Sequence, residues 1–478
     1  MYDVIIIGAG VVGCSCAYYL SRYDLKVAVL EKENDVSLGT TKANSAIIHA
    51  GFDPEEGTLM AFHNVRGAKL TKDLCRDLDV PYQQCGAMVL AFNEEDNKTI
   101  EMLYQRGLAN GVEGLKLLNK EETLQLEPNV SPEVTGCLLA GTSAIISPWE
   151  FTLAMAETAV KNGVEVKLNN GVESITKENG IFTVTTGEGQ YQSKYIVNAA
   201  GVDADKVHEM IGEKEFTIKP SKGEYYLLDK SEGNRTTHTI FQCPTKVGKG
   251  VLVSPTVAGN LIVGPTTEDS DSENTDTSAD GLAFIKETGV KSVPSIDFRE
   301  NIRNFAGIRA RSDHHDFIVS ESQSVENFFN LAGIKSPGLS SAPSLGLSVV
   351  EWLQEKGEQL NEKQDFIFTR KKVRMKDLSI EEKCALIKER PEYGRIICRC
   401  ETVSEGEIMD AIHSTIPAVS IDGVKRRCGA GFGRCQGGFC GERVASILMR
   451  ELNISGLDVL QDQKGSNILL AKTKGGKA

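Results

Sequence analysis

The pattern of apolar and polar positions predicts a βαβ unit at the start of the chain. Residues 4–7 form a continuous apolar run, which is typical of a strand covered on both faces. A glycine-rich turn follows over residues 8–13, and residues 14–22 have helical patterning. A second apolar strand, Val27–Leu30, ends at Glu31. We expect the connection between these two parallel strands to be right-handed.

Further strands and helices are predicted at widely separated positions. Strand patterns cover residues 164–166, 195–200, 220–226, 305–311 and 329–333. A helix is expected to begin near Ser340, and helical patterning returns at 405–413 and 443–451. This mixture of elements, opened by a βαβ unit, predicts an α/β fold.

The 478 residues suggest about three domains at ~150 residues each. Apolar periodicity is lost over residues 354–365, so residues 1–365 are expected to form a first large unit. A linker over 366–393, which contains the basic stretch 369–374, would lead to a Cys-rich domain at 394–455. Residues 456–478 are predicted to be a flexible tail.

Composition and charge exclude some classes of protein. The net charge of -13 argues against a nucleic-acid partner. No apolar run approaches ~20 residues, so no transmembrane segment is expected, although peripheral contact at the inner face of a membrane stays open. The N-terminus has no secretory signal, and most of the 12 Cys are scattered as in a reducing compartment. We therefore expect a soluble, cytoplasmic protein.

The turn after the first strand has the spacing of a dinucleotide fingerprint. Gly8 would permit the tight turn, Gly10 would let the backbone approach a pyrophosphate, and Gly13 would allow close helix–strand packing. The following helix would offer free N–H groups to the phosphates. Glu31, at the end of the next strand, would accept hydrogen bonds from ribose hydroxyls. A glycine-rich turn that binds nothing is the alternative.

Four cysteines near the C-terminal end form two close pairs. They are Cys398 with Cys400, and Cys435 with Cys440. This spacing matches structural zinc sites poorly, since those generally use Cys-x2–4-Cys knuckles, whereas iron–sulfur clusters accept varied spacings. Several glycines around the second pair would let loop N–H groups reach cluster sulfurs. The pattern favours an iron–sulfur cluster over a zinc-bound or metal-free structural domain.

On these motifs, residues 1–350 resemble the D-amino-acid-oxidase superfamily of FAD enzymes. Residues 394–445 resemble the [2Fe–2S] domain of the bacterioferritin-associated ferredoxin type. This two-part layout resembles the anaerobic-type glycerol-3-phosphate dehydrogenases. The resemblance assigns the cluster to the four paired cysteines and leaves Cys428 as a non-ligand, although an exchange of ligands stays open.

The resemblance implies a Rossmann-like FAD-binding domain that is interleaved with a mixed α+β substrate domain. The FAD-binding parts would be about 1–80, 145–215 and 300–360, and the substrate parts about 81–144 and 216–299. The C-terminal [2Fe–2S] domain would be a small unit of helices and loops. Beyond the fingerprint, the implied FAD contacts are Asn44, Ser45, Val166, Ala200, Gly201, Gly333, Gly338, Leu339 and Ser340.

Candidate substrate residues come from three segments. His49 would accept a hydroxyl proton, since an imidazole ionises near ~6.5. Its segment, residues 41–51, resembles the stretch that crosses the flavin in L-2-hydroxyglutarate and glycerol-3-phosphate dehydrogenases. Lys222 and Tyr225 lie in a segment that resembles a strand over the active site of the 2-hydroxyglutarate enzymes, and they would bind an anion. Arg309 and Arg311 would share one strand face and bind a phosphate or carboxylate, with Lys335 as a third cation. The alternatives are a structural histidine, an ordinary half-exposed strand, and a surface arginine pair matched with Asp313 and Asp316.

The prediction is an FAD-dependent dehydrogenase that oxidises a small anionic alcohol and passes electrons through [2Fe–2S] to a partner flavoprotein or another acceptor subunit. Glycerol 3-phosphate is preferred as substrate, a 2-hydroxyacid comes second, and an amino or imino acid third. A rival from another class is an electron-transfer subunit whose partner performs the substrate chemistry. The retained His49 and the anion-binding set favour the enzyme.

Overall fold

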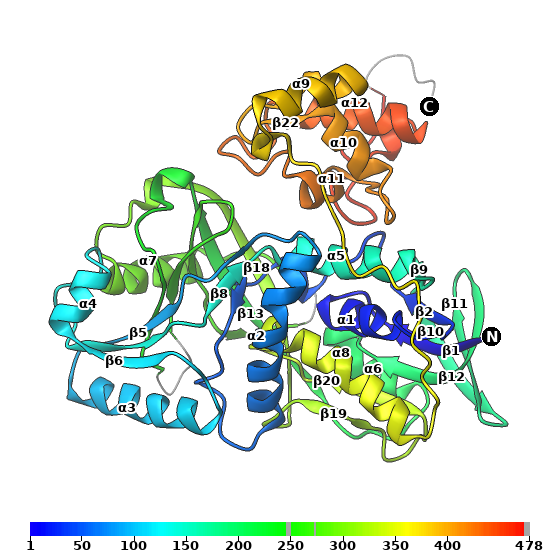
Figure 1. The fold of residues 1–478 in the computed structure, drawn as a ribbon, viewed down its shortest axis with the longest axis horizontal. Coiled ribbons are helices and arrows are strands. Elements are labelled where there is room, and N and C mark those ends of the chain that lie inside the picture. The colour runs from blue at the N-terminus through cyan, green and yellow to red at the C-terminus, as the bar shows by residue number, and fades with distance from the viewer. Residues whose placement is uncertain (245–249, 272–273, 473–478) are drawn as a thin grey trace.

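The predicted βαβ unit lies at the centre of an eight-stranded mixed sheet in the computed structural model, which describes residues 1–244, 250–271 and 274–472 (Figure 1). The parallel strands are β1 (Tyr2–Ile7), β2 (Val27–Leu30), β9 (Glu165–Lys167), β12 (Gly189–Asn198) and β20 (Phe328–Ala332). Three antiparallel strands extend the sheet: β10 (Val172–Glu178), β11 (Ile181–Thr186) and β19 (Ile318–Glu321).

Both faces of β1 are buried, as its apolar run predicts. Val4 and Ile6 belong to the core formed with the helices α1 (Val11–Leu20), α5 (Pro148–Lys161) and α8 (Gly338–Glu355). Ile5 and Ile7 pack on the other face with Phe182 of the β10–β11 hairpin. The long helix α2 (Leu59–Asp77) packs against α8, and α6 (Ala204–Glu209) contacts β20. Helix α1 begins at Val11, earlier than predicted, because Gly10 is already its N-cap.

The interleaved second domain is a nine-stranded sheet. Its strands are β5 (Ala87–Ala91), β6 (Leu115–Asn119), β7 (Gly136–Ala140), β13 (Ile218–Leu228), β14 (Thr239–Gln242), β15 (Leu252–Pro255), β16 (Leu261–Gly264), β17 (Glu268–Asp269) and β18 (Asn301–Ser312). Helices α3 (Glu94–Ala109), α4 (Lys120–Leu126) and α7 (Ala279–Ser292) cover it. A small sheet of β3 (Ile47–Ile48), β4 (Tyr82–Gln83) and β8 (Ala144–Ile146) also belongs to the first large unit.

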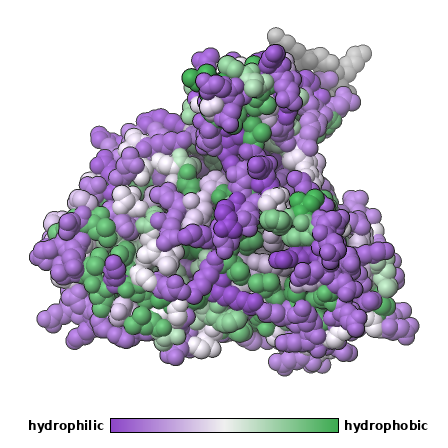
Figure 2. Space-filling view, viewed as in Figure 1, coloured by the Kyte–Doolittle hydropathy of each residue, from purple (hydrophilic) through white to green (hydrophobic). Residues whose placement is uncertain are grey.

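The C-terminal residues form a separate lobe with its own apolar core, which rests above α5 (Figure 1). Its elements are α9 (Ile380–Glu389), β21 (Ile396–Cys398), β22 (Val403–Ser404), α10 (Glu405–Ile412), α11 (Ile421–Cys428) and α12 (Gly441–Leu452). The patterning at 405–413 and 443–451 thus corresponds to α10 and α12. Hydrophilic side chains cover most of the visible surface of this lobe (Figure 2).

Two segments differ from the prediction. The expected linker contains α9, and its Arg370 forms a buried ion pair with Glu157 of α5, so the chain is fastened to the first unit before it reaches the lobe. The expected flexible tail is ordered over its first part, because Leu460 bridges to Ser420 and Asn467. Among the described residues, no helix is long and apolar enough to span a membrane.

Candidate FAD and iron–sulfur sites

The turn between β1 and α1 has the backbone geometry of a dinucleotide site. Gly8 has a φ of +101°, and a Cβ there would lie 2.5 Å from the carbonyl oxygen of Ala199. A Cβ on Gly13 would lie 1.9 Å from the carbonyl oxygen of Gly8. Gly10 has an ordinary φ of -71°, and its Cβ would meet Thr41 Oγ1 at 3.4 Å. The protein's own backbone therefore requires Gly8 and Gly13, whereas the space at Gly10 is left for a ligand.

The Glu31 carboxylate closes this turn from the end of β2. It accepts hydrogen bonds from the backbone N–H groups of Ala9 at 2.6 Å and Glu33 at 3.0 Å. Burial raises the pKa of the Glu31 carboxyl above its usual value, although the two N–H groups oppose the shift. Glu31 and Gly10 line the same cavity, so the carboxylate lies where a dinucleotide ribose would bind.

The helices that begin at the expected cofactor sites have no side-chain cap. Seven of the described helices with eight or more residues begin at a Ser, Thr or Asn whose side chain accepts an N–H of the first turn. The exceptions are α1 at Gly10, α8 at Pro337 and α12 at Cys440. Uncapped N–H groups and the positive end of the helix dipole attract anions. These ends therefore fit a pyrophosphate, an electron-rich flavin and a cluster thiolate, respectively.

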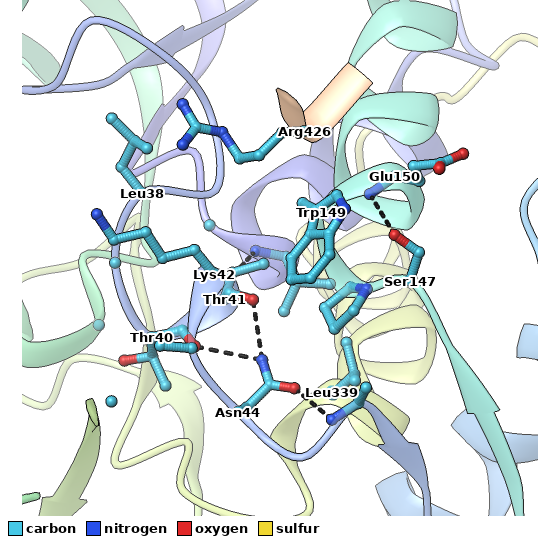
Figure 3. Close-up of a pocket in the computed structure, with 18 of the residues that line it drawn as sticks. Leu38, Thr40, Thr41, Lys42, Asn44, Ser147, Trp149, Glu150, Leu339 and Arg426 are labelled. Atoms are coloured by element: carbon cyan, nitrogen blue, oxygen red, sulfur yellow. Dashed lines mark hydrogen bonds between the residues drawn. The ribbon is translucent and has the colours of Figure 1, made fainter. Parts of the chain in front are cut away.

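A large cavity of about 1660 Å³ connects these features, which is more than the ~300–1,000 Å³ of an ordinary ligand pocket. Its lining includes the fingerprint turn, residues 38–47 and residues 334–339 before and within the first turn of α8. The C-terminal lobe contributes Lys425, Arg426 and Phe432 to the lining. Thr41, Asn44 and Trp149 face this hollow in Figure 3. The size and chemistry of the cavity fit FAD with room for a substrate.

The segment expected to cross the flavin is fastened by its own polar groups. The Asn44 side chain accepts the N–H of Ala46 at 2.8 Å and donates to the carbonyl of Thr41 at 2.9 Å. Thr41 Oγ1 accepts the N–H of Val11 at 3.0 Å, which ties the segment to the start of α1. Asn44 and Ser45 both line the cavity, as their assignment to the cofactor requires.

His49 lies in the cavity wall and is positioned by its backbone. Its N–H donates to Ser340 Oγ at 2.8 Å, and the Asn64 amide donates to its carbonyl at 2.6 Å. The imidazole lies 5.7 Å from the ring of Phe241. Ser340, which the resemblance assigned to FAD, is buried and outside the cavity lining. We therefore assign Ser340 to holding the His49 segment against α8.

The remaining predicted FAD contacts fall into two groups. Ala200, Gly201, Gly338 and Leu339 line the cavity. Val166 pairs with Val29 inside the sheet, and Gly333 turns the chain after β20 with a φ of +65°; neither lines the cavity. Asn170, Gly171 and Val172 line the end beyond Glu31 instead. The sequence signal for them was their position directly after β9, one strand along from Glu31.

The predicted anion-binding residues divide between the two faces of the β13–β18 ladder. Tyr225 lies opposite Phe305 and stacks on it at 4.8 Å between ring centroids, and its hydroxyl is 3.3 Å from Ser45 Oγ. Arg309 lies opposite Ser221, and since strand side chains alternate, it shares this face with Tyr225. This face meets the flavin-crossing segment.

Lys222 points to the other face, so its interpretation as an anion-binding residue together with Tyr225 is wrong in this structure. It is 7% exposed, its ammonium lies 3.1 Å from Glu224 Oε1, and it donates to the carbonyl of Asp276 at 3.0 Å. Glu224 in turn accepts the N–H of Ser278 at the start of α7. Successive side chains of a strand point to opposite faces, and positions 222 and 225 differ by an odd number. Lys222 and Tyr225 therefore lie on opposite faces of β13.

The two arginines of β18 have different partners. Arg311 forms an ion pair with Asp269, not with Asp313 or Asp316. The Arg309 guanidinium donates to the carbonyls of Lys222 at 3.4 Å and Thr266 at 3.2 Å. Lys335 lines the cavity and donates to the carbonyl of His315 at 3.1 Å. Arg309 therefore keeps a positive charge that no described carboxylate balances at close range.

The four predicted ligand cysteines meet in the C-terminal lobe as two pairs. The sulfurs of Cys400 and Cys435 are 3.8 Å apart, and Cys398 is hydrogen-bonded to Cys440. In the part of the chain that the structure describes, no group of three or more His, Cys, Asp or Glu side chains is placed to hold a metal ion. Two thiol pairs fit a two-iron cluster, which is held by four thiolates.

Hydrogen bonds favour the thiolate form at one cysteine of each pair, whereas the contact with the paired cysteine raises the pKa of the other member, Cys440 or Cys400. The hydrogen bond with Cys440 lowers the pKa of Cys398 to about 6 despite its burial, and the N–H of Gly431 contributes. The N–H of Phe439 lowers the pKa of Cys435. Burial raises the pKa of Cys428 to about 12, and its thiol donates to the Val424 carbonyl of its own helix at 3.3 Å. The geometry thus leaves Cys428 outside the two pairs.

Trp149 and Phe432 are functional candidates that the sequence reasoning missed. Their rings stack at 5.3 Å between centroids with 21° between planes, and both line the cavity. Trp149 belongs to the first turn of α5, and Phe432 precedes Cys435 in the cluster loop. Their separation along the chain hid the contact, since no pattern in either segment refers to the other.

Comparisons with known proteins agree with this geometry. A family model described as FAD dependent oxidoreductase matches residues 3–352, and one described as BFD-like [2Fe-2S] binding domain matches residues 396–450. The chain is 48% identical over 476 residues to a glycerol 3-phosphate dehydrogenase of Caloramator mitchellensis, which covers 99% of each protein. It is 33% identical over 271 residues to an L-2-hydroxyglutarate dehydrogenase of Escherichia coli, covering 55% of this chain and 64% of that protein.

A solved structure extends the similarity to three dimensions. It is the dithionite-reduced L-α-glycerophosphate oxidase of Mycoplasma pneumoniae with FAD bound, at 34% identity and a TM-score of 0.74. The match covers 98% of the oxidase and 77% of this chain. On these findings, together with the cavity and the paired cysteines, the chain belongs to the family of FAD-dependent oxidoreductases and carries a [2Fe–2S]-binding domain of the BFD-like type.

Proposed function

We propose that this enzyme oxidises sn-glycerol 3-phosphate to dihydroxyacetone phosphate and delivers the electrons through its cluster domain to a partner protein. The observation that carries the proposal is the 48% identity to a glycerol 3-phosphate dehydrogenase along 99% of both chains, cluster domain included. When bound, FAD supplies hydride acceptance and the [2Fe–2S] cluster supplies one-electron transfer.

Residues of this chain support that chemistry at defined places. His49 lines the cavity and is the proposed acceptor of the substrate hydroxyl proton. Arg309 lies on the face shared with Tyr225 and is the proposed partner of the substrate phosphate. Ser45 joins the two regions, since it lines the cavity and contacts the Tyr225 hydroxyl. Lys222 has no part in this proposal because Glu224 neutralises it on the other face.

The proposed electron acceptor is a protein, such as another flavoprotein or a quinone-linked subunit. The similarity to the glycerophosphate oxidase covers nearly all of that enzyme but 77% of this chain, so the oxidase has no counterpart to a substantial part of this protein. The dehydrogenase relative matches along the whole chain. This difference supports a role of the C-terminal lobe in the choice of acceptor.

A 2-hydroxyacid such as L-2-hydroxyglutarate is the second candidate substrate. It is favoured by the 33% identity to an L-2-hydroxyglutarate dehydrogenase, although that match covers 55% of this chain. A carboxylate and a phosphate would both suit Arg309, so the anion site by itself does not choose between them.

Anaerobic reduction of the purified holoenzyme tests the proposal. Glycerol 3-phosphate should bleach the visible absorbance of both flavin and cluster, whereas L-2-hydroxyglutarate and glycine should leave the flavin oxidised. Bleaching by L-2-hydroxyglutarate alone would transfer the assignment to the second candidate. If no small anionic alcohol or amino acid reduced the flavin, the chain would instead be an electron-transfer subunit.

A further inference from the structure

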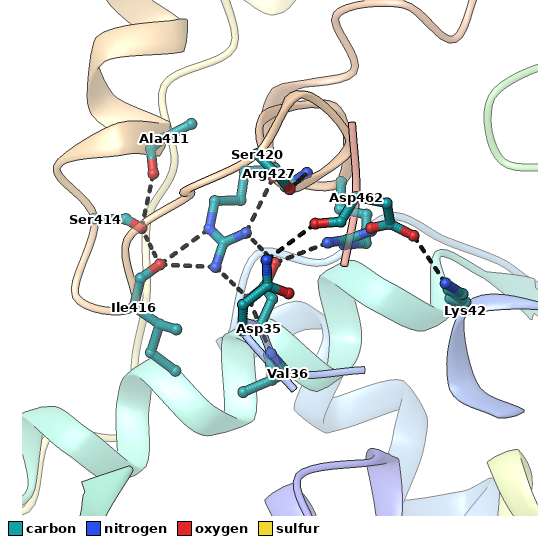
Figure 4. A network of polar contacts seen from close by, with 12 residues as sticks. Asp35, Val36, Lys42, Ala411, Ser414, Ile416, Ser420, Arg427 and Asp462 are labelled. Carbon is teal, nitrogen blue, oxygen red and sulfur yellow. Dashed lines mark hydrogen bonds and ion pairs between the residues drawn. The ribbon is translucent and has the colours of Figure 1, made fainter. Parts of the chain in front are cut away.

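A buried ion cluster fastens the C-terminal lobe to the loop that follows Glu31. Asp35 of that loop accepts from Arg427 Nη2 at 2.8 Å (Figure 4) and from Arg426 Nη2 at 3.0 Å, and both arginines belong to α11. All three residues are at most 5% exposed. Burial would raise the pKa of Asp35, but the two guanidinium groups outweigh it and hold the pKa below its usual value.

The tail extends this cluster across the same boundary. Asp462 pairs with Arg426 at 2.6 Å and with Lys42 at 2.8 Å, and its carbonyl accepts from the Asn34 amide at 3.0 Å. Asn34 and Lys42 both lie in the segment that leads from Glu31 to Asn44. One polar network therefore joins the cofactor-binding loop, α11 and the ordered part of the tail.

A second, apolar contact also joins the lobe to the first unit. The stacked pair of Trp149 and Phe432 spans the two domains, and the ammonium of Lys425 lies 4.9 Å from the Phe432 ring centroid. All three residues line the same cavity as the fingerprint turn. The lobe thus forms part of the wall of the FAD cavity and does not hang free on its linker.

We propose that this docked interface determines the electron acceptor, because the lobe shields the reduced flavin from dioxygen and keeps the cluster in reach. The proposal rests on the proposed function for its substrate. With the lobe docked, a [2Fe–2S] cluster held by the four paired cysteines would supply the one-electron route by which the two electrons lost by the alcohol leave. With the lobe displaced, dioxygen takes both electrons and two protons to give hydrogen peroxide. Asp35 and Trp149 are accordingly specificity-determining residues that act by positioning the lobe.

The test compares Asp35→Asn with Lys230→Met in the full-length holoenzyme. Asp35→Asn keeps the size of the side chain but removes the charge shared by both arginines, and loss of one partner of a buried pair is far costlier than loss of an exposed one. Lys230 also crosses the interface, to Glu401, but it is 43% exposed. Iron and FAD contents of both variants should match the wild type, since neither residue is a proposed ligand.

Three measurements report whether the lobe is docked, and none of them depends on turnover. Small-angle scattering should show a larger radius of gyration in Asp35→Asn, and iodide should quench its flavin fluorescence more strongly. After photoreduction without substrate, its flavin should be reoxidised by air faster than in the wild type, with peroxide as product. Lys230→Met should behave as the wild type in all three. Photoreduction bypasses the alcohol, so these results stand even if the proposed substrate is wrong.

Two outcomes would overturn the proposal. An expanded Asp35→Asn protein with unchanged reoxidation by air would show that the lobe is no shield. Unchanged scattering and unchanged iodide quenching would show that the Asp35 cluster does not hold the lobe. If Asp35→Asn fails to fold or loses FAD, Trp149→Leu tests the same interface through its apolar contact, and its reoxidation rate decides by the same criterion.

Discussion

His49 owes its place in the cavity wall to hydrogen bonds of its own backbone with Ser340 and Asn64. A change of its side chain should therefore leave the segment in place. We predict that His49→Asn lowers kcat for glycerol 3-phosphate by ~10²–10⁴, the usual contribution of a general base, while KM stays within a few-fold. Stopped-flow anaerobic flavin reduction measures this directly. An unchanged rate would move the base to another residue or to a water.

His63 is another histidine, and its burial changes its pKa. It is buried between α2 and α8, with Nδ1 2.9 Å from Ser344 Oγ, and burial lowers its pKa to about 4. The unfolded chain, with a pKa near ~6.5, binds more protons between these values, so stability is complete above pH ~6.5 and falls as the pH drops toward 4. The loss would be about 3 kcal/mol at most.

We predict that His63→Gln removes much of this acid sensitivity. Thermal unfolding between pH 7 and 4 should show a smaller fall of Tm in His63→Gln than in the wild type. His314→Gln, a change of an exposed histidine, is the matched control and should keep the wild-type slope. Parallel Tm curves for wild type and His63→Gln would mean that His63 is not the group that senses acid.

At the scale of elements, the β1–α1 turn needs glycine for two different reasons: backbone packing at Gly13 and FAD binding at Gly10. Gly13→Ala would place a Cβ 1.9 Å from the Gly8 carbonyl and should destabilise even the FAD-free protein by ~1–3 kcal/mol. Gly10→Ala meets its nearest atom at 3.4 Å and should fold normally but bind FAD at least ~10-fold more weakly. Apoprotein Tm and FAD titration measure the two effects. If Gly10→Ala bound FAD as tightly as the wild type, the result would contradict the placement of a pyrophosphate at this turn.

Elements were predictable wherever one local pattern specifies them. The apolar run of β1, the glycine spacing and the helical periodicity of α10 each appear in a few consecutive residues. Pairing across β13 and β18 is different, because Arg309 and Tyr225 share a face only through a register that joins residues far apart in the chain. The error at Lys222 came from treating neighbouring residues of one strand as if they faced one site.

At the scale of the whole molecule, we expect electrons to leave the enzyme through the cluster that the two thiol pairs would hold. We predict that Cys435→Ser loses the cluster, as measured by iron content and visible absorbance, while glycerol 3-phosphate still bleaches the flavin. Turnover with a one-electron acceptor should fall by ~10-fold or more, since electrons then lack their relay. Cys428→Ser is the control. The Cys428 thiol donates to the Val424 carbonyl of its own helix, so this variant should keep the cluster. Full turnover in Cys435→Ser would exclude the relay.

The sequence by itself indicated a dinucleotide site and an iron–sulfur cluster, because the fingerprint turn, Glu31 and the two cysteine pairs are local patterns with a characteristic spacing. The choice of FAD and of a [2Fe–2S] cluster came from the resemblance to known families. The tertiary structure decided what these parts do together: that the C-terminal lobe lines the same cavity as the fingerprint turn, that Trp149 meets Phe432, and that Asp35 pairs with two arginines of α11. Contacts between distant segments depend on packing and register, and neither leaves a periodic signal in the segments that make them.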